Sequence, residues 1–123
     1  MKLHADRNAH LNTITAYGGD WVEINGSRYR GSLLVSPSGA VRSWPVASFE
    51  TLDAPALLAL ADDRPEVILL GTGPRLRFPD PALIRPLARV GIGLEAMDFV
   101  AACRTYNILM AEGRRVLAAL MRS

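Results

Sequence analysis

The stretch EVILLGTGPRLRFPD, residues 66–80, decides the fold class of this chain. It begins with a short apolar run that lies between Pro65 and Gly71. Such a run is typical of a central strand buried on both faces, as in α/β sheets. A glycine-rich turn with two arginines comes next, and Asp80 then caps a helical pattern. The stretch therefore predicts a buried strand, a loop and a helix in succession.

Two further elements follow along the chain. Apolar residues at helical spacing predict a helix over residues 81–91, which Pro86 should kink or shorten and which Gly91 is placed to end. IGLEAM, residues 92–97, has the pattern of a second short strand. The chain thus alternates between strand and helix from residue 66 onward.

A third helix opens the C-terminal part of the chain. Asp98 is placed as its N-cap, and Gly113 is placed to end it in the left-handed conformation. RRVLAALMRS, residues 114–123, is ambiguous, because Leu and Ala favour helix whereas the stop at Gly113 argues for a new element. We expect a final strand here that closes the sheet.

The first half of the chain has the composition of β-strands. Asn25-Gly26 is a strong hairpin signal, so an antiparallel meander is expected. Asp53 then caps a short helix that ends before Arg64. The predicted strands are ITAYGG (14–19), WVEIN (21–25), SRYRGSLLVS (27–36) and AVRSWPV (40–46).

These elements predict an α/β fold of three layers, with a mixed sheet of about five strands, helices, and an antiparallel N-terminal β portion. The length of 123 residues suits one domain with a proper core and is too short for two. We expect a single domain over residues 1–123, with a mobile segment over residues 1–12.

Composition excludes several classes of protein. Half of the residues are hydrophobic and 21% are charged, as in folded soluble proteins. Arginine supplies 13 of the 14 basic residues, but neither a basic block nor stacking aromatics predict nucleic-acid binding. A single cysteine argues against a disulfide or a multi-cysteine metal site, and no cofactor or metal is predicted. Without a long apolar run or a signal-peptide pattern, we expect a cytoplasmic protein.

Three segments together resemble a known family. They are GTG at 71–73, GIGLEAMD at 91–98 and ACRTYNILMAEGRRVLAAL at 102–120, in this order and at these separations. They resemble the small domain family of bacteria, archaea and mitochondria that includes mitochondrial complex I assembly factor three. The resemblance implies a single α/β domain with a mixed five-stranded sheet, and it implies protein-protein contact. It supplies no catalytic residues.

The leading candidate site is the loop of Gly71, Thr72 and Gly73, at the carboxyl end of the predicted strand. Its N–H groups could face an anion, and Arg75 and Arg77 would lie on one side of an extended segment and close over it. The loop matches no complete phosphate-binding motif, and the proline after it removes a donor. We favour a structural turn over a ligand site.

Three other side chains have both a structural and a functional interpretation. Asn107, an amide on a largely apolar helix, either ties a loop to the helix or binds a ligand, and we favour the tie. Cys103 is either a reactive thiol or a core cysteine, and we favour the core. Asp98 could form an acid–base pair with Glu95, but an N-cap explains it better. No complete catalytic constellation is found.

Two functions are consistent with these patterns. The first is a non-enzymatic interaction or assembly module whose partner is another protein. The second is a small-ligand domain or enzyme that holds an anion at residues 71–73, with Arg75, Arg77 and Asn107 as candidate ligand-binding residues. We favour the first, because the family resemblance supports it.

Overall fold

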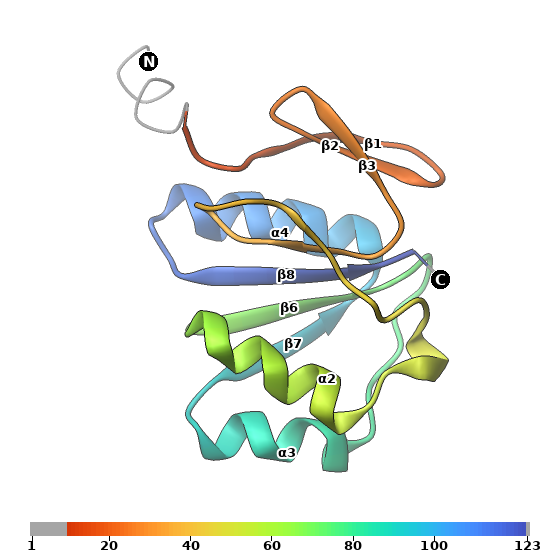
Figure 1. Cartoon of the computed structure of the whole chain (residues 1–123), viewed down its shortest axis with the longest axis vertical. Coiled ribbons are helices and arrows are strands. Elements are labelled where there is room, and N and C mark those ends of the chain that lie inside the picture. Colours follow the sequence, from red (N-terminus) through yellow and green to blue (C-terminus); the bar gives the residue numbers. More distant parts are fainter. Residues whose placement is uncertain (1–9, 123) are drawn as a thin grey trace.

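The predicted buried strand lies inside a five-stranded sheet. The computed structural model describes residues 10–122, and this strand is β6, Val67–Thr72 (Figure 1). All six of its residues are buried. β6 pairs in parallel with β7, Gly93–Met97, on one side and with β8, Val116–Met121, on the other. The strand predicted in the C-terminal tail is therefore confirmed, and it lies in the interior of the sheet instead of at its edge.

The other half of this sheet is antiparallel. β8 pairs with β4, Leu33–Val35, and β4 pairs with the two-residue strand β5, Arg42–Ser43. The strand order is β5-β4-β8-β6-β7, so the sheet is mixed, as predicted.

Helices cover both faces of the sheet. α4, Phe99–Ala111, lies on one face, and α2, Ala54–Ala59, and α3, Pro81–Arg89, lie on the other (Figure 1). Because side chains alternate along a strand, Val67 and Leu69 pack in the core under α4, whereas Ile68 and Leu70 pack under α2 and α3. Two cores thus share one central sheet, which explains the continuous apolar run of β6.

A second, three-stranded sheet packs against α4. It consists of β1, Ile14–Tyr17, β2, Trp21–Ile24, and β3, Ser27–Arg30, in antiparallel order. Asn25 and Gly26 form the β2–β3 turn with φ of 51° and 86°, which confirms the predicted hairpin. This antiparallel sheet is the predicted N-terminal β portion, and it lies on the far side of α4 from the mixed sheet (Figure 1).

Two predicted strands differ from the observed ones. The expected strand over residues 27–36 is two strands, β3 and β4, which belong to different sheets and are separated at Gly31, where φ is 76°. The expected strand over residues 40–46 is reduced to β5. Between β5 and β6 the chain forms α2 and two 3-10 helices, η1, Phe49–Thr51, and η2, Leu60–Asp63.

The predicted helix ends are confirmed. The carboxylates of Asp53, Asp80 and Asp98 each accept a backbone N–H hydrogen bond of 2.9 Å at the start of α2, α3 and α4. Gly113 has φ of 82° directly after α4, and its N–H donates to the Met110 carbonyl, so it ends that helix in the predicted way. Pro86 lies inside α3, which continues to Arg89.

The segment before β1 is described only in part. Residues 1–9 of the segment expected to be mobile lie outside the described residues. Asn12 is held by its neighbours, because its N–H donates to the Pro37 carbonyl and its carbonyl accepts from the Tyr106 hydroxyl, at 2.8 and 2.7 Å. Within residues 10–122, none of the helices has the length and apolar character that crossing a membrane requires.

Candidate functional site

The Gly71–Gly73 loop is closed by its own threonine. The Thr72 Oγ1 accepts a hydrogen bond from the Arg77 backbone N–H at 3.0 Å, and its proton is directed to the Arg75 carbonyl at 2.7 Å or the Met97 carbonyl at 3.1 Å. The Gly73 carbonyl in turn accepts from the Phe99 N–H at 2.7 Å. The polar groups of this buried turn are thus largely used to hold the β6–α3 loop and the start of α4 together.

The two arginines of the loop do not converge on the glycines. Arg75 is exposed to solvent. Arg77 turns toward η1, where its Nη1 pairs with the Glu50 carboxylate at 2.5 Å and its guanidinium lies 4.7 Å from the centre of the Phe49 ring. A backbone hydrogen bond and, after it, the Arg77 guanidinium lower the pKa of the Glu50 carboxyl. Arg77 therefore fixes the loop to the preceding segment, and anion binding by this pair stays a prediction.

Asn107 ties α4 to the first strand. Its Oδ1 accepts from the Ile14 N–H at 3.0 Å, and its Nδ2 donates to the Ile14 carbonyl at 2.8 Å. Asn107 is eight residues beyond Phe99 on α4, which corresponds to about 12 Å along the helix. The structure therefore separates Asn107 from the loop at Gly73, and its amide is engaged with the backbone of β1.

A pocket of about 460 Å³ opens beside Gly73, and Arg122 is the positively charged residue that lines it. The β1–β2 turn, the residues after β6 and the start of α4 line this pocket. The Arg122 guanidinium lies 3.7 Å from the centre of the Phe99 ring, and its Nη2 donates to the Gly18 and Gly19 carbonyls. Its Nε and Nη1 are buried and have no hydrogen-bond partner among the described residues. Burial lowers the pKa of Arg122, an effect that Cys103 and Asp20 oppose.

The sequence analysis did not single out Arg122. The chain offers one local signal, a basic residue immediately after a buried strand. Its hydrogen bonds, however, are with residues about a hundred positions earlier in the sequence.

The same edge of the sheet carries an exposed apolar loop. Leu76 is 45% exposed and Phe78 is 76% exposed, on either side of the anchored Arg77. Pro79 is buried immediately after them. The backbone of this segment is therefore held between and directly after the two exposed residues, while their apolar side chains face solvent. Sequence reasoning missed Phe78, because an aromatic residue in a loop has no periodic pattern that marks it as exposed.

Cys103 is a core cysteine. It is 2% exposed on the inward face of α4. Burial raises the pKa of its thiol to about 12, and the positive charge of Arg122 offsets part of that rise. Because the thiolate is the nucleophilic form, a thiol in this environment is inert at neutral pH.

The raised pKa of Cys103 predicts a loss of stability at alkaline pH. Above pH 9 the thiol ionises in the unfolded chain but stays protonated in the folded chain until about pH 12. The unfolded state then binds fewer protons, so this group lowers the free energy of unfolding by up to about 1.4 kcal/mol per pH unit as pH rises. Urea unfolding of the wild type and of Cys103→Ala at several pH values measures the effect.

The slope of stability against pH is the decisive quantity, because Cys103→Ala also removes core volume. The variant should lose stability less steeply than the wild type above pH 9. At pH 8 the native thiol should resist a disulfide reagent that labels the urea-unfolded chain at once. Equal slopes, or rapid labelling of the native protein, would show that the thiol is accessible.

Solved structures share this fold. A crystal structure of a Bordetella parapertussis protein matches with a TM-score of 0.86 at 48% identity, covering 92% of this chain and 97% of the other. A solution structure of a Bordetella pertussis protein, described as a Mth938-like domain, matches with a TM-score of 0.81 at 41% identity, covering 92% and 87% of the two chains.

Relatives of the chain include named assembly factors. The NADH dehydrogenase (ubiquinone) 1 alpha subcomplex assembly factor 3 of Xenopus tropicalis is 31% identical over 116 residues, which cover 93% of this chain and 63% of that protein. An uncharacterised protein of Rhodobacter capsulatus is 36% identical over 108 residues, which cover 88% and 82% of the two chains. This chain thus spans less than two thirds of the length of the Xenopus assembly factor.

The family model described as "Protein of unknown function (DUF498/DUF598)" matches residues 14–121. This match runs from the first residue of β1 to the last residue of β8, so it includes both sheets and all the helices. The chain belongs to the DUF498/DUF598 family, in agreement with the resemblance carried by residues 71–73, 91–98 and 102–120.

Proposed function

We propose that this protein is a non-enzymatic interaction module that acts like an assembly factor and binds a protein partner through the loop of residues 73–80. The observation that carries the proposal is the exposure of Phe78, at 76%, on a loop whose backbone is fixed. Large aromatic side chains are enriched at the energetic centres of protein interfaces. A fixed backbone also reduces the entropy lost when a partner binds.

The contacts of Arg77 support this use of the loop. Its backbone N–H is bound by Thr72, and its side chain is bound by Glu50 and stacked on Phe49. Leu76 and Phe78 are therefore presented together, with neither of them needed for the core. The relatives that are named as assembly factors support a protein as the partner. The identity of that partner and the cytoplasmic location stay predictions.

The alternative is an anion-binding domain at the Gly71–Gly73 loop. The pocket beside Gly73 favours it, together with the two unpartnered nitrogens of Arg122. Against it, Thr72 and Arg77 are engaged in contacts within the protein, and the Asp98 carboxylate also lines the pocket. We therefore place protein binding first.

Truncation of Phe78 tests the proposal. We expect Phe78→Ala to weaken capture of a specific partner at least tenfold, about 1.4 kcal/mol, in quantitative affinity purification from the source organism. Because the side chain is exposed, the free energy of unfolding should change by less than about 0.5 kcal/mol.

The matched control is Ile108→Ala, which removes a 58% exposed apolar side chain from α4. This variant should capture the partner as the wild type does. Equal loss with both variants would indicate non-specific hydrophobic capture. Recovery of the partner at wild-type levels with Phe78→Ala would rule out the 73–80 loop as the binding surface.

A further inference from the structure

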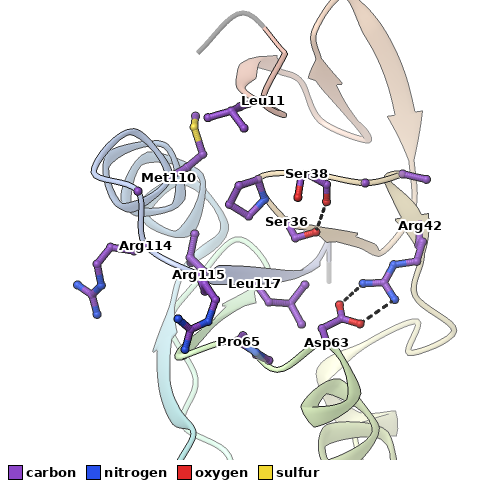
Figure 2. Close-up of a pocket in the computed structure, with 15 residues that line it drawn as sticks. Leu11, Ser36, Ser38, Arg42, Asp63, Pro65, Met110, Arg114, Arg115 and Leu117 are labelled. Atoms are coloured by element: carbon purple, nitrogen blue, oxygen red, sulfur yellow. Dashed lines mark hydrogen bonds and ion pairs between the residues drawn. The ribbon is translucent and has the colours of Figure 1, made fainter. Parts of the chain in front are cut away.

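A second pocket lies at the opposite edge of the mixed sheet. It has a volume of about 570 Å³ and is found where β6 and β8 begin, whereas the Gly71–Gly73 loop is found where β6 ends (Figure 2). We call it the amino-edge pocket. Its volume is within the range of small-molecule sites in proteins, which is roughly 300–1,000 Å³.

Apolar side chains form much of its wall. Met110 comes from the end of α4, Leu117 from β8, and Pro65 from the segment before β6 (Figure 2). Pro37 and Leu11, both partly exposed, supply accessible apolar surface from the N-terminal half of the chain, whereas Met110 and Leu117 are only 3% and 0% exposed. Such a wall favours a ligand with an apolar body, because burial of that body releases water from both surfaces.

Of the three arginines that line the pocket, Arg115 is the one that forms no ion pair within residues 10–122. Arg42 is paired with Asp63, and Arg114 is paired with Glu66 at 3.1 Å. The Arg115 backbone N–H donates a hydrogen bond to the Glu66 Oε1 at 2.9 Å, and its side-chain Nε donates a long hydrogen bond to the Arg64 carbonyl at 3.4 Å. Within residues 10–122, the two terminal nitrogens of Arg115 have no hydrogen-bond partner.

The side chains of the three arginines lie differently with respect to the pocket. Figure 2 shows the Arg114 side chain directed away from the pocket and the Arg115 side chain beside Pro65 at its rim. Arg42 and Asp63 lie together on the other side of the opening (Figure 2). Arg115 therefore offers a free guanidinium edge at the boundary between the apolar wall and solvent.

One rim of the pocket is held in place before any ligand binds. The Asn12 Nδ2 donates to the Ser36 carbonyl at 2.9 Å and to the Gly39 carbonyl at 2.8 Å. The Asn12 carbonyl is bound by the buried Tyr106 of α4. This chain of hydrogen bonds fixes the loop of residues 36–40 over the pocket, so little ordering entropy would be lost on binding.

We propose that the amino-edge pocket binds a small monocarboxylate with an apolar body, whose carboxylate pairs with Arg115 while the body lies against Leu11 and Pro37. A single carboxylate matches the one lining arginine that is in no ion pair, and a guanidinium binds a carboxylate through two parallel hydrogen bonds. This site is separate from the 73–80 loop, so it goes beyond the proposed function.

Titration with octanoate, followed by amide NMR of the whole chain, tests the proposal. Saturable shifts are expected at Leu11, Ser38 and Arg115, which line the pocket. Octanol, which has the same apolar body without the charge, should bind at least tenfold more weakly, and acetate, which has no such body, should cause no saturable shift. Arg115→Ala should reduce octanoate affinity at least tenfold and leave octanol binding unchanged.

Arg104→Ala is the matched control, because Arg104 is an exposed arginine of α4 that does not line the pocket. It should bind octanoate as the wild type does. Phe78→Ala should also bind octanoate normally, and this result would show that the pocket is separate from the proposed interface. The proposal would be overturned if octanoate caused no saturable shifts up to about 10 mM. A dissociation constant above that concentration corresponds to a binding free energy weaker than about 3 kcal/mol. Octanoate binding of wild-type strength in a folded Arg115→Ala variant would overturn it as well.

Discussion

Replacing Asn107 with alanine is expected to lower the free energy of unfolding by roughly 2–4 kcal/mol. The substitution leaves both the N–H and the carbonyl of Ile14 without the partners that Asn107 supplies, at 3.0 and 2.8 Å. Each polar group that loses its partner away from water costs about 1–3 kcal/mol. Chemical denaturation followed by fluorescence of the two tryptophans measures the loss.

The region of the structure that Asn107→Ala destabilises is a stricter test than the size of the loss in stability. Ile14 lies in β1 and packs in the core under the three-stranded sheet. Hydrogen exchange of the Ile14 amide should therefore accelerate in Asn107→Ala, whereas amides of β6 should follow the global change alone. Ile108→Ala, on the next residue of the same helix, should change stability by less than about 0.5 kcal/mol, because its side chain faces solvent. An equal effect of the two substitutions would mean that Asn107 does not act through Ile14.

The sequence predicts the mixed sheet well, for a physical reason. Strands covered on both faces are apolar along their buried length, and residues 67–70 of β6 show this as a short run between a proline and a glycine turn. The three aspartate caps are equally local, because each carboxylate binds an N–H two or three residues away. Information of this kind lies within a few residues of the element that it specifies.

The division of the N-terminal strands depends on distant contacts. Residues 27–36 have one continuous strand pattern, but β3 pairs with β2 whereas β4 pairs with β8 near the C-terminus. No local feature says that the second half of the run belongs to another sheet. The positive φ of Gly31 allows the change of direction, yet a glycine at that point is also consistent with a bulge in one strand.

The candidate sites also depend on contacts between residues that are far apart in the sequence. The Gly71–Gly73 loop was recognisable as a turn, but the sequence does not say that the Thr72 side chain would fill it. The amino-edge pocket is assembled from residues near position 11, positions 36–42, 63–65 and 110–117. Residues so far apart in the chain have no common spacing, so only the fold brings Arg115 beside the apolar wall.

Gly71→Val is expected to destabilise the protein by about 3 kcal/mol or more, the upper end of the range for overpacked cores. Gly71 does not need a positive φ. Its constraint is space, because a Cβ at this position would lie 3.0 Å from the Leu120 Cδ2 and 3.2 Å from the Ala102 Cβ. The Leu120 side chain can rotate, but the Ala102 methyl is fixed to the backbone of α4. Any side chain at position 71 must therefore push α4 away from the sheet.

Gly93→Ala is the matched control, since Gly93 is also a strand glycine without positive φ but has no atom within 4 Å of an added Cβ. It should be neutral or stabilise by up to about 1 kcal/mol, because alanine restricts the unfolded chain. Gly71→Ala should cost about 1–3 kcal/mol. Combining it with Ala102→Gly, which removes the fixed methyl, should cost less than the sum of the two single changes by at least about 0.5 kcal/mol. Strict additivity in this double-mutant cycle would mean that Ala102 does not limit the space at Gly71, and that β6 and α4 are not packed as closely as the structure places them.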